Sequence, residues 1–105
     1  MPIRIRVLGP IEVVVGRHPQ PVPGRRSRSL LAALVLGIDH LVPIDHLVAA
    51  VWGDDPPVSA RNTLQTHVST LRSLLGRDLI EFDEEAYILR LSPDSVDAVR
   101  FERLT

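Results

Sequence analysis

Short, uncharged polar side chains cluster between residues 60 and 75, with a spacing that places them on one face of a helix. Apolar residues recur in this stretch at steps of four, three and four, at Leu64, Val68, Leu71 and Leu75, which predicts an amphipathic helix with one buried stripe. At about 100° per residue, the side chains opposite this stripe are Asn62, Thr66, Ser69, Thr70 and Ser73, flanked by Thr63, Gln65 and Arg72. Their amides and hydroxyls are groups that hydrogen-bond base edges in the major groove of DNA.

The charges of this stretch fit the same chemistry. Between residues 60 and 75 there is no acidic residue, and the basic ones are Arg61 and Arg72. A helix that only faces solvent more often carries Glu and Lys, and acids on a DNA-facing helix would be repelled by phosphate. Two interpretations stay open: a DNA-reading face, or an ordinary surface helix that is rich in Ser and Thr.

Composition limits the class of protein. A chain of 105 residues with no Cys predicts one domain without a disulfide framework or a thiolate metal site. Its longest apolar run, residues 30–36, is far shorter than the roughly twenty residues of a membrane span, and the N-terminus lacks a signal-peptide pattern. We therefore expect a soluble cytoplasmic protein with no membrane partner, cofactor or metal. Metal-ligand spacing is absent from His18, His40 and His46.

Enzyme chemistry finds no support in the motifs. Asp45 and His46 resemble an acid–base pair, but adjacent residues of a helix point about 100° apart and do not face each other. No nucleophile elbow, P-loop or dinucleotide-binding fingerprint occurs. The three consecutive acids at 83–85 cannot supply the six or more oxygens of a calcium site. We predict that the chain is not an enzyme.

The net charge of −1 hides a separation of basic and acidic residues along the chain. Residues 1–28 carry six Arg and one acid, and residues 59–77 carry three Arg and no acid. Phosphate binding depends on local positive charge, so this pattern permits DNA binding. At the start of the first helix, positive charge opposes the helix dipole. Contact with phosphate or polymerase would explain why Arg25, Arg26 and Arg28 occur there. The alternative is that these arginines are only solvated.

The remaining chain alternates strand patterns with helical ones. Period-two alternation predicts strands at 3–7 and 11–15, and a weak edge strand at 18–22 because of Pro19 and Pro21. Helical patterns cover 28–36, ended by Gly37, and a helix opened by Pro43 and ended by Gly53. For the helix of residues 59–75, Ser59 is the expected N-cap and Gly76 the C-terminal signal. A hairpin follows, with strands at 79–82 and 87–91 and its tip at 83–86.

This order predicts an α+β fold, a winged helix-turn-helix with an N-terminal antiparallel β-sheet, three helices and a C-terminal β-hairpin wing. Residues 1–92 would form this DNA-binding domain. Residues 93–105 would be a linker and the start of a helix that belongs to a following domain, because so few turns cannot bury the apolar face of Val99, Phe101 and Leu104 alone.

Four motifs occur in unbroken order along nearly the whole chain. They are Leu8-Gly9-Pro10-Ile11-Glu12-Val13, Arg26-Ser27-Arg28-Ser29-Leu30-Leu31-Ala32-Ala33-Leu34, Val51-Trp52-Gly53-Asp54-Asp55-Pro56-Pro57, and Ala60-Arg61-Asn62-Thr63-Leu64-Gln65-Thr66 followed by Val68-Ser69-Thr70-Leu71-Arg72. Together they resemble the Streptomyces antibiotic regulatory proteins, which are OmpR-type winged-helix activators. The resemblance implies a transcriptional activator of a secondary-metabolite gene cluster. Such a protein is monomeric in solution, binds direct repeats as head-to-tail pairs, and contacts RNA polymerase, including its sigma subunit. A helical activation domain would follow.

The resemblance also implies roles for individual residues. The helix of residues 59–75 would be the recognition helix in the major groove. Nearest the bases or adjoining phosphates would lie Thr63, Thr66, His67 and Thr70, and contacts with the backbone or neighbouring bases would come from Asn62, Ser69 and Arg72. Trp52 matches a position that touches phosphate through the indole nitrogen. The candidate DNA-binding set is completed by Gln65, Arg61, Arg25, Arg26 and Arg28. The alternatives are a half-buried structural role for His67 and a core role for Trp52.

The sequence departs from the family pattern at two places. The family often has Arg where Thr70 and Ser73 stand, which leaves this helix with fewer charged contacts. The wing tip Asp83-Glu84-Glu85 is acidic, where relatives carry Gly and Tyr and some OmpR-type proteins an Arg that reaches the minor groove. Because the minor groove is strongly negative, we predict that this wing stays away from DNA or contacts protein. The acidic wing also fits a rival function, a winged-helix protein-interaction module with weak or no DNA binding.

Overall fold

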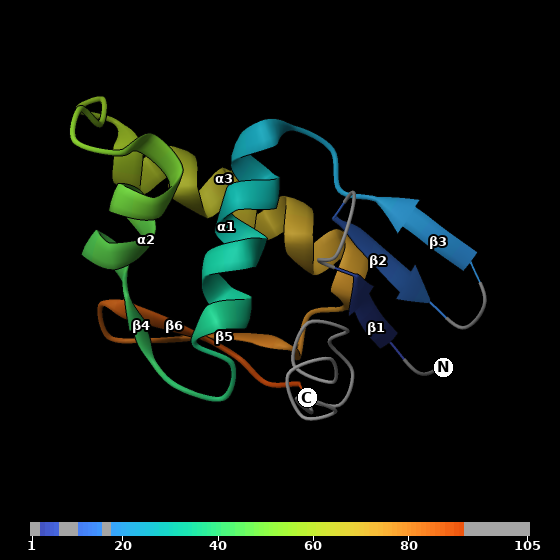
Figure 1. The fold of residues 1–105 in the computed structure, drawn as a ribbon. Helices are drawn as coiled ribbons and strands as arrows, with labels where there is room; N and C mark the ends of the chain where they lie inside the picture. Colours follow the sequence, from blue (N-terminus) through green and yellow to red (C-terminus); the bar gives the residue numbers. More distant parts are fainter. Residues whose placement is uncertain (1–2, 7–10, 16–17, 92–105) are drawn as a thin grey trace, which may run out of the picture.

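The computed structural model describes residues 3–6, 11–15 and 18–91 of the chain. The elements are β1 (Ile3–Arg6), β2 (Glu12–Val15), β3 (His18–Pro21), α1 (Arg25–Leu36), β4 (Val42–Pro43), α2 (Ile44–Trp52), α3 (Ala60–Leu75), β5 (Ile80–Asp83) and β6 (Ala86–Leu89). Three helices pack with two three-stranded antiparallel sheets, one N-terminal and one formed around the C-terminal hairpin (Figure 1). The predicted α+β winged-helix architecture is confirmed.

In the N-terminal sheet the strands follow chain order, β1-β2-β3. Ile5 pairs with Val13, and both side chains are buried, as the alternating pattern predicted. β3 is an edge strand, the position in which a sheet tolerates residues such as Pro19 and Pro21. The last residue of the predicted first strand, Val7, lies outside the described residues.

α1 begins at Arg25, three residues before the predicted start at Arg28. The apolar pattern starts only at Leu30 because the preceding core position is held by a polar residue, Ser27, which is 3% exposed. The Arg28 N–H donates to the Gly24 carbonyl at 3.2 Å, so the first helical turn closes on Gly24. Its φ of 82° lies in the region that glycine adopts without strain.

A two-residue strand, β4, precedes α2 and is too short to give a periodic signal in the sequence. Pro43 pairs with Ala86 of β6, so the wing becomes a three-stranded sheet of order β4-β6-β5. At the start of α2, the Ile44 N–H donates to the Glu85 carbonyl at 2.9 Å. The turn of the wing is therefore attached to α2 through the backbone.

The bounds of α2 and α3 agree with the prediction to within one residue, and Gly76 ends α3 as predicted. Ser59 stands at the N-cap position and its side chain makes no capping hydrogen bond. Its backbone angles, φ −84° and ψ 12°, are close to helical values, whereas a capping side chain reaches back from an extended backbone. The Ala60 N–H instead donates to the Pro57 carbonyl at 3.0 Å.

β5 and β6 form the predicted hairpin, with a tighter tip than expected. Asp83 pairs with Ala86, so the strands reach further toward the tip and the turn contains two residues, Glu84 and Glu85. Glu84 has a φ of 55°, in keeping with the positive φ that two-residue hairpin turns require. Two of the three acidic residues of the tip are thus held in a short, defined turn, and Asp83 ends β5.

One core joins both sheets to the three helices, and α1 contacts both α2 and α3. Its fully buried members include Ile5, Val13, Leu30, Leu34, Leu47, Leu64, Val68, Leu71, Ile80 and Leu89. Among the described residues, no helix combines the length and the apolar character that crossing a bilayer requires.

Gly37→Ala should destabilise the domain. A Cβ at position 37 would lie 2.6 Å from Cγ2 of Val42, and the branched Val42 side chain has little freedom to move away. We expect urea unfolding to show a loss of about 1–3 kcal/mol. The loss should be smaller when the same change is made in a Val42→Ala background. An equal loss in the two backgrounds would contradict the proposed clash.

Candidate nucleic-acid interface

The exposed face of α3 presents uncharged donors and acceptors. Its apolar stripe, which includes Leu64, Val68 and Leu71, is turned into the core. The side chains left exposed are Asn62, Gln65, Thr66, Ser69 and Ser73, and Thr63 and Thr70 are partly exposed beside them. The structure therefore brings most of the residues predicted to face DNA onto one side of the helix.

Two hydroxyl groups on this face are already engaged within the helix. The Thr70 hydroxyl donates to the Thr66 carbonyl at 3.2 Å, and the Ser73 hydroxyl donates to the Ser69 carbonyl at 3.1 Å. Because their protons are used, these hydroxyls offer lone pairs to a ligand, and Thr70 also offers its methyl group. The side-chain amides of Asn62 and Gln65 each offer both a donor and an acceptor, which is the combination that adenine requires.

A second group of predicted residues gathers where the start of α1 meets the end of α2 and one flank of α3. The ring centroid of His67 lies 6.2 Å from that of Trp52. The guanidinium carbon of Arg26 lies 5.8 Å from the Trp52 ring centroid, which is a cation–π contact. Together with Arg25, these residues line a hollow of about 500 Å³. The edge of the α3 face at α1 is therefore basic and partly aromatic.

Within this group, the structure places His67 beneath the surface rather than on the exposed face. Its Nδ1 lies 3.2 Å from the Ser27 hydroxyl oxygen, and its Nε2 is buried with no hydrogen-bond partner among the described residues. The half-buried ring joins α3 to α1, in line with the structural alternative. Ser27 is not among the predicted site residues, although its spacing of three and four residues from Leu30 and Leu31 marks it as a core position.

Arg72, predicted to contact DNA, uses two of its donors inside the protein. Its Nε and Nη2 donate to the Ile80 carbonyl at 3.2 and 2.9 Å, which ties the end of α3 to β5. Arg72 also lines a hollow of about 510 Å³ with Ser69, Ser73 and Arg77. Arg77 is exposed and makes no ion pair with any described residue. Arg77 is not among the residues predicted from the sequence to bind DNA.

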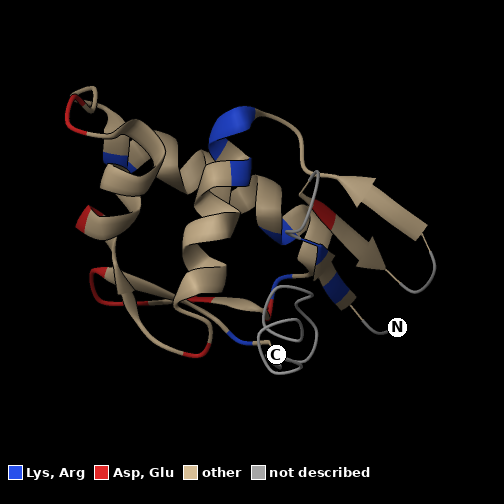
Figure 2. Cartoon of the chain, in the orientation of Figure 1, with Lys and Arg blue, Asp and Glu red and all other residues tan. Residues whose placement is uncertain are grey.

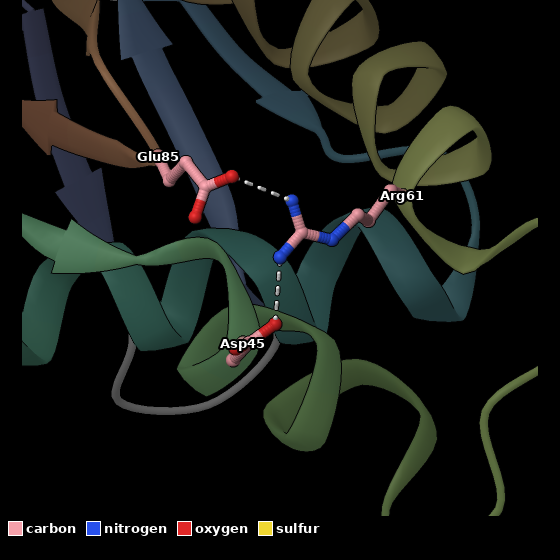
Figure 3. Close-up of polar contacts among 3 residues, drawn as sticks. All are labelled: Asp45, Arg61 and Glu85. Atoms are coloured by element: carbon pink, nitrogen blue, oxygen red, sulfur yellow. Dashed lines mark hydrogen bonds and ion pairs between the residues drawn. The ribbon is translucent and has the colours of Figure 1, made fainter.

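Arg61, also predicted to contact DNA, is engaged with two carboxylates from different elements (Figure 3). Its Nη2 lies 3.1 Å from Oδ1 of Asp45 in α2, and its Nη1 lies 3.5 Å from Oε1 of Glu85 in the wing turn. The acidic wing tip therefore meets the first turn of α3. No local pattern in the sequence could reveal this contact, because the three residues are far apart in the chain.

Basic residues gather at the start of α1, and many of the acidic residues gather on the side of α2 and the wing turn (Figure 2). At the start of α1 are Arg25, Arg26 and Arg28, and of these Arg28 donates from Nη1 to the Val22 carbonyl at 3.3 Å. Acids occur on α2, in the loop after it and at the wing tip, at Asp45, Asp54, Asp55 and residues 83–85. The α3 face thus has a positive edge at α1 and a negative edge at the wing.

Comparison with known proteins places this arrangement in a family. Residues 22–91 match the model of the family described as "Transcriptional regulatory protein, C terminal". This match runs from the end of the N-terminal sheet through the wing. The chain belongs to this family, the OmpR-type winged-helix domains.

Several regulators of this winged-helix family are similar to the chain. It is 33% identical over 95 residues to "Regulatory protein AfsR" of Streptomyces griseus, which covers 90% of this chain and 10% of AfsR. It is 31% identical over 114 residues to "Regulatory protein DnrI" of Streptomyces peucetius, which covers 97% of this chain and 42% of DnrI. A solved structure, "Mycobacterium tuberculosis EmbR in complex with low affinity phosphopeptide", has a TM-score of 0.88 at 30% identity and covers 94% of this chain and 28% of that chain.

The family assignment confirms the resemblance to the Streptomyces antibiotic regulatory proteins. It also confirms that this winged-helix domain is a transcription-regulator domain and not an enzyme. The chain spans between 10% and 42% of the length of the curated relatives named above.

Ser27→Ala should destabilise the winged-helix domain. The change removes the partner of the His67 Nδ1 and leaves a half-buried imidazole unsatisfied, which costs about 1–3 kcal/mol in urea unfolding. Ser29→Ala is the matched control, because Ser29 is half-buried in the same helix and its side chain makes no hydrogen bond with a described residue. We expect the control to change stability by less than about 0.5 kcal/mol. Equal losses for the two variants would show that the Ser27–His67 contact does not stabilise the domain.

Proposed function

We propose that this domain reads specific DNA sequences for a transcriptional regulator, with α3 in the major groove. One observation carries the proposal: the exposed face of α3 is rich in amides and hydroxyls and contains no acid. Unpaired cations lie beside it, because Arg25 and Arg77 make no ion pair with any described residue. Such a face can approach phosphates without repulsion and hydrogen-bond base edges. Membership of a family of transcriptional regulatory proteins supports this function.

The placement of the side chains supports a division of labour among them. Base edges would be read by Asn62, Gln65, Thr66 and Ser69, which are exposed. Thr63 and Thr70, at the α1 edge of the face, would pack on thymine methyl groups or adjoining phosphates. Phosphates would be bound by Arg25, Arg26 and the Trp52 indole at one end of the interface, and by Arg77 at the other. Arg28, Arg72 and His67 would position these groups through their contacts inside the domain.

We infer further that the whole regulator activates a secondary-metabolite gene cluster in the bacterial cytoplasm. It would be a monomer in solution that binds direct repeats as a head-to-tail pair and contacts RNA polymerase, including the sigma subunit. Residues 1–92 would be the DNA-binding domain, and residues 93–105 the start of a following activation domain. The resemblance to antibiotic regulatory proteins supports this inference, as does the small share of the relatives' length that the chain spans.

A protein-interaction module is the second candidate function, and the acidic side of the domain favours it. In the loop between α2 and α3, Val58 is fully exposed and follows Asp54-Asp55 and two prolines. An exposed apolar side chain beside carboxylates suits a partner protein with basic and apolar residues. This function predicts that substitutions on the α3 face leave DNA binding untouched.

Thr66→Ala and Arg77→Ala separate base reading from phosphate binding. We expect the 105-residue chain to prefer duplexes with direct repeats about one helical turn apart over scrambled duplexes by at least ~10³-fold. Thr66→Ala should change the base preference by about 1 kcal/mol. Arg77→Ala should weaken binding to every duplex and reduce the slope of log K against log salt by about one. Both effects are measured by fluorescence anisotropy in a salt series.

Arg90→Ala is the matched control for Arg77→Ala. It removes the same charge at the open end of the wing hairpin, where Arg90 is paired with Glu81 at 3.3 Å, and we expect the salt slope to stay unchanged. Binding without preference for the repeats, together with no response to Thr66→Ala, would contradict sequence reading by α3 and favour the protein-interaction module.

A further inference from the structure

We propose that Asp45 and Glu85 are specificity-determining residues that hold the Arg61 guanidinium and keep it from binding DNA phosphate. The two carboxylates act as intramolecular competitors of the DNA backbone at the first turn of α3. Their effect is to weaken binding to non-specific DNA and so to raise the preference for the specific site. This inference rests on the proposed DNA-binding function.

The geometry of the contact supports this role. Arg61 is the second residue of α3, and its two terminal nitrogens point to different partners, with Nη2 at 3.1 Å from Asp45 and Nη1 at 3.5 Å from Glu85. Figure 3 shows the two carboxylates on opposite sides of the guanidinium, one from α2 and one from the wing turn. Two negative charges surround one positive charge, so the cluster carries a net charge of −1. A phosphate that approaches Arg61 therefore meets repulsion.

The Glu85 carboxylate is held near Arg61 by the fold as well as by the ion pair. Its own backbone carbonyl accepts a hydrogen bond from the Ile44 N–H at 2.9 Å, and the neighbouring Ala86 pairs with Pro43 of β4. The turn that contains Glu85 has two residues, so it has little freedom to swing away. The competitor is therefore preorganised beside α3, and this gives the acidic wing tip a function that a solvated turn would lack.

The ion pairs of Arg61 are strong enough to change DNA affinity measurably and weak enough for a phosphate to replace the carboxylates. The side chains are 51% exposed for Arg61, 81% for Asp45 and 79% for Glu85, and exposed ion pairs of this kind shift an equilibrium by at most about five-fold. Non-specific binding consists almost entirely of phosphate contacts. A domain that is not fixed at one position along the duplex can slide until a free arginine contacts a phosphate. In the specific complex, base contacts fix the register and the positions of the phosphates. Removing the competitor should therefore help non-specific binding more.

Glu85→Gln tests this competition on the 105-residue chain with a scrambled duplex. The change removes one of the two negative charges around Arg61, so we expect affinity for this duplex to rise about two- to five-fold. Because Asp45 still pairs with Arg61, the salt slope should become steeper by less than one. The affinity for a duplex with direct repeats should rise less, so the specificity ratio falls. Glu84→Gln is the matched control: it removes the same charge from the same turn, and Glu84 makes no ion pair with a described residue. Its effect should be less than half as large.

An Arg61→Ala background makes the test decisive. There, Glu85→Gln should raise the affinity no more than Glu84→Gln does, because the cation for which Glu85 competes is absent. Equal effects of Glu84→Gln and Glu85→Gln would overturn the inference in favour of a general field of the wing. The inference would also be overturned if Glu85→Gln kept its full effect without Arg61, or if it had no effect in the unmodified background. If the unmodified chain prefers the repeats but the Glu85 variants do not show the predicted effects, this inference fails and the proposed function stands. If the unmodified chain binds no DNA, both proposals fail. Urea unfolding of each variant shows that the fold is retained.

Discussion

The burial of one apolar stripe of α3 against the core is the constraint on which the rest of the domain depends. Because Leu64, Val68 and Leu71 are at most 1% exposed, the opposite face must point outward, and its composition decides what the domain can bind. The flanks of the helix are fixed from two sides. The Ser27–His67 contact joins α3 to α1, and Arg72 joins it to β5. The candidate interface is therefore presented by packed helices rather than by a loop.

The charges around this fixed face are unequal at its two edges. The α1 edge carries arginines whose nearest described partners are an aromatic ring, a backbone carbonyl or none, while the wing edge carries acids that neutralise Arg61. Phosphate attraction supplies affinity without sequence information, and base contacts supply selectivity. On the proposed function, a face that is rich in amides and hydroxyls and poor in free cations favours selectivity over affinity. The near-neutral net charge of the chain is consistent with this balance.

The sequence predicts this fold well where elements are long and periodic. α2 and α3 have clear apolar stripes and terminal glycines, so their bounds follow to within a residue. α1 is predicted three residues short because Ser27 fills a core position that a count of apolar residues passes over, and β4 has too few residues to show any period. The partners of Arg61 lie 16 and 24 residues away in the chain. Contacts over such separations depend on tertiary packing, so Arg61 and Arg72 look free in the sequence and are engaged in the structure.

Mapping the DNA-contacting surface by NMR is the most direct test of whether α3 reads DNA. The duplex would be selected by the 105-residue chain itself from a randomised pool, and backbone amide shifts would be followed as the duplex is added. We expect the largest shift changes along the exposed face of α3, at Asn62, Thr66 and Ser69, and at the start of α1, with small changes at Glu84 and Glu85. Changes confined to the wing or to the loop between α2 and α3, or a pool from which no duplex is enriched, would contradict the claim that α3 reads DNA.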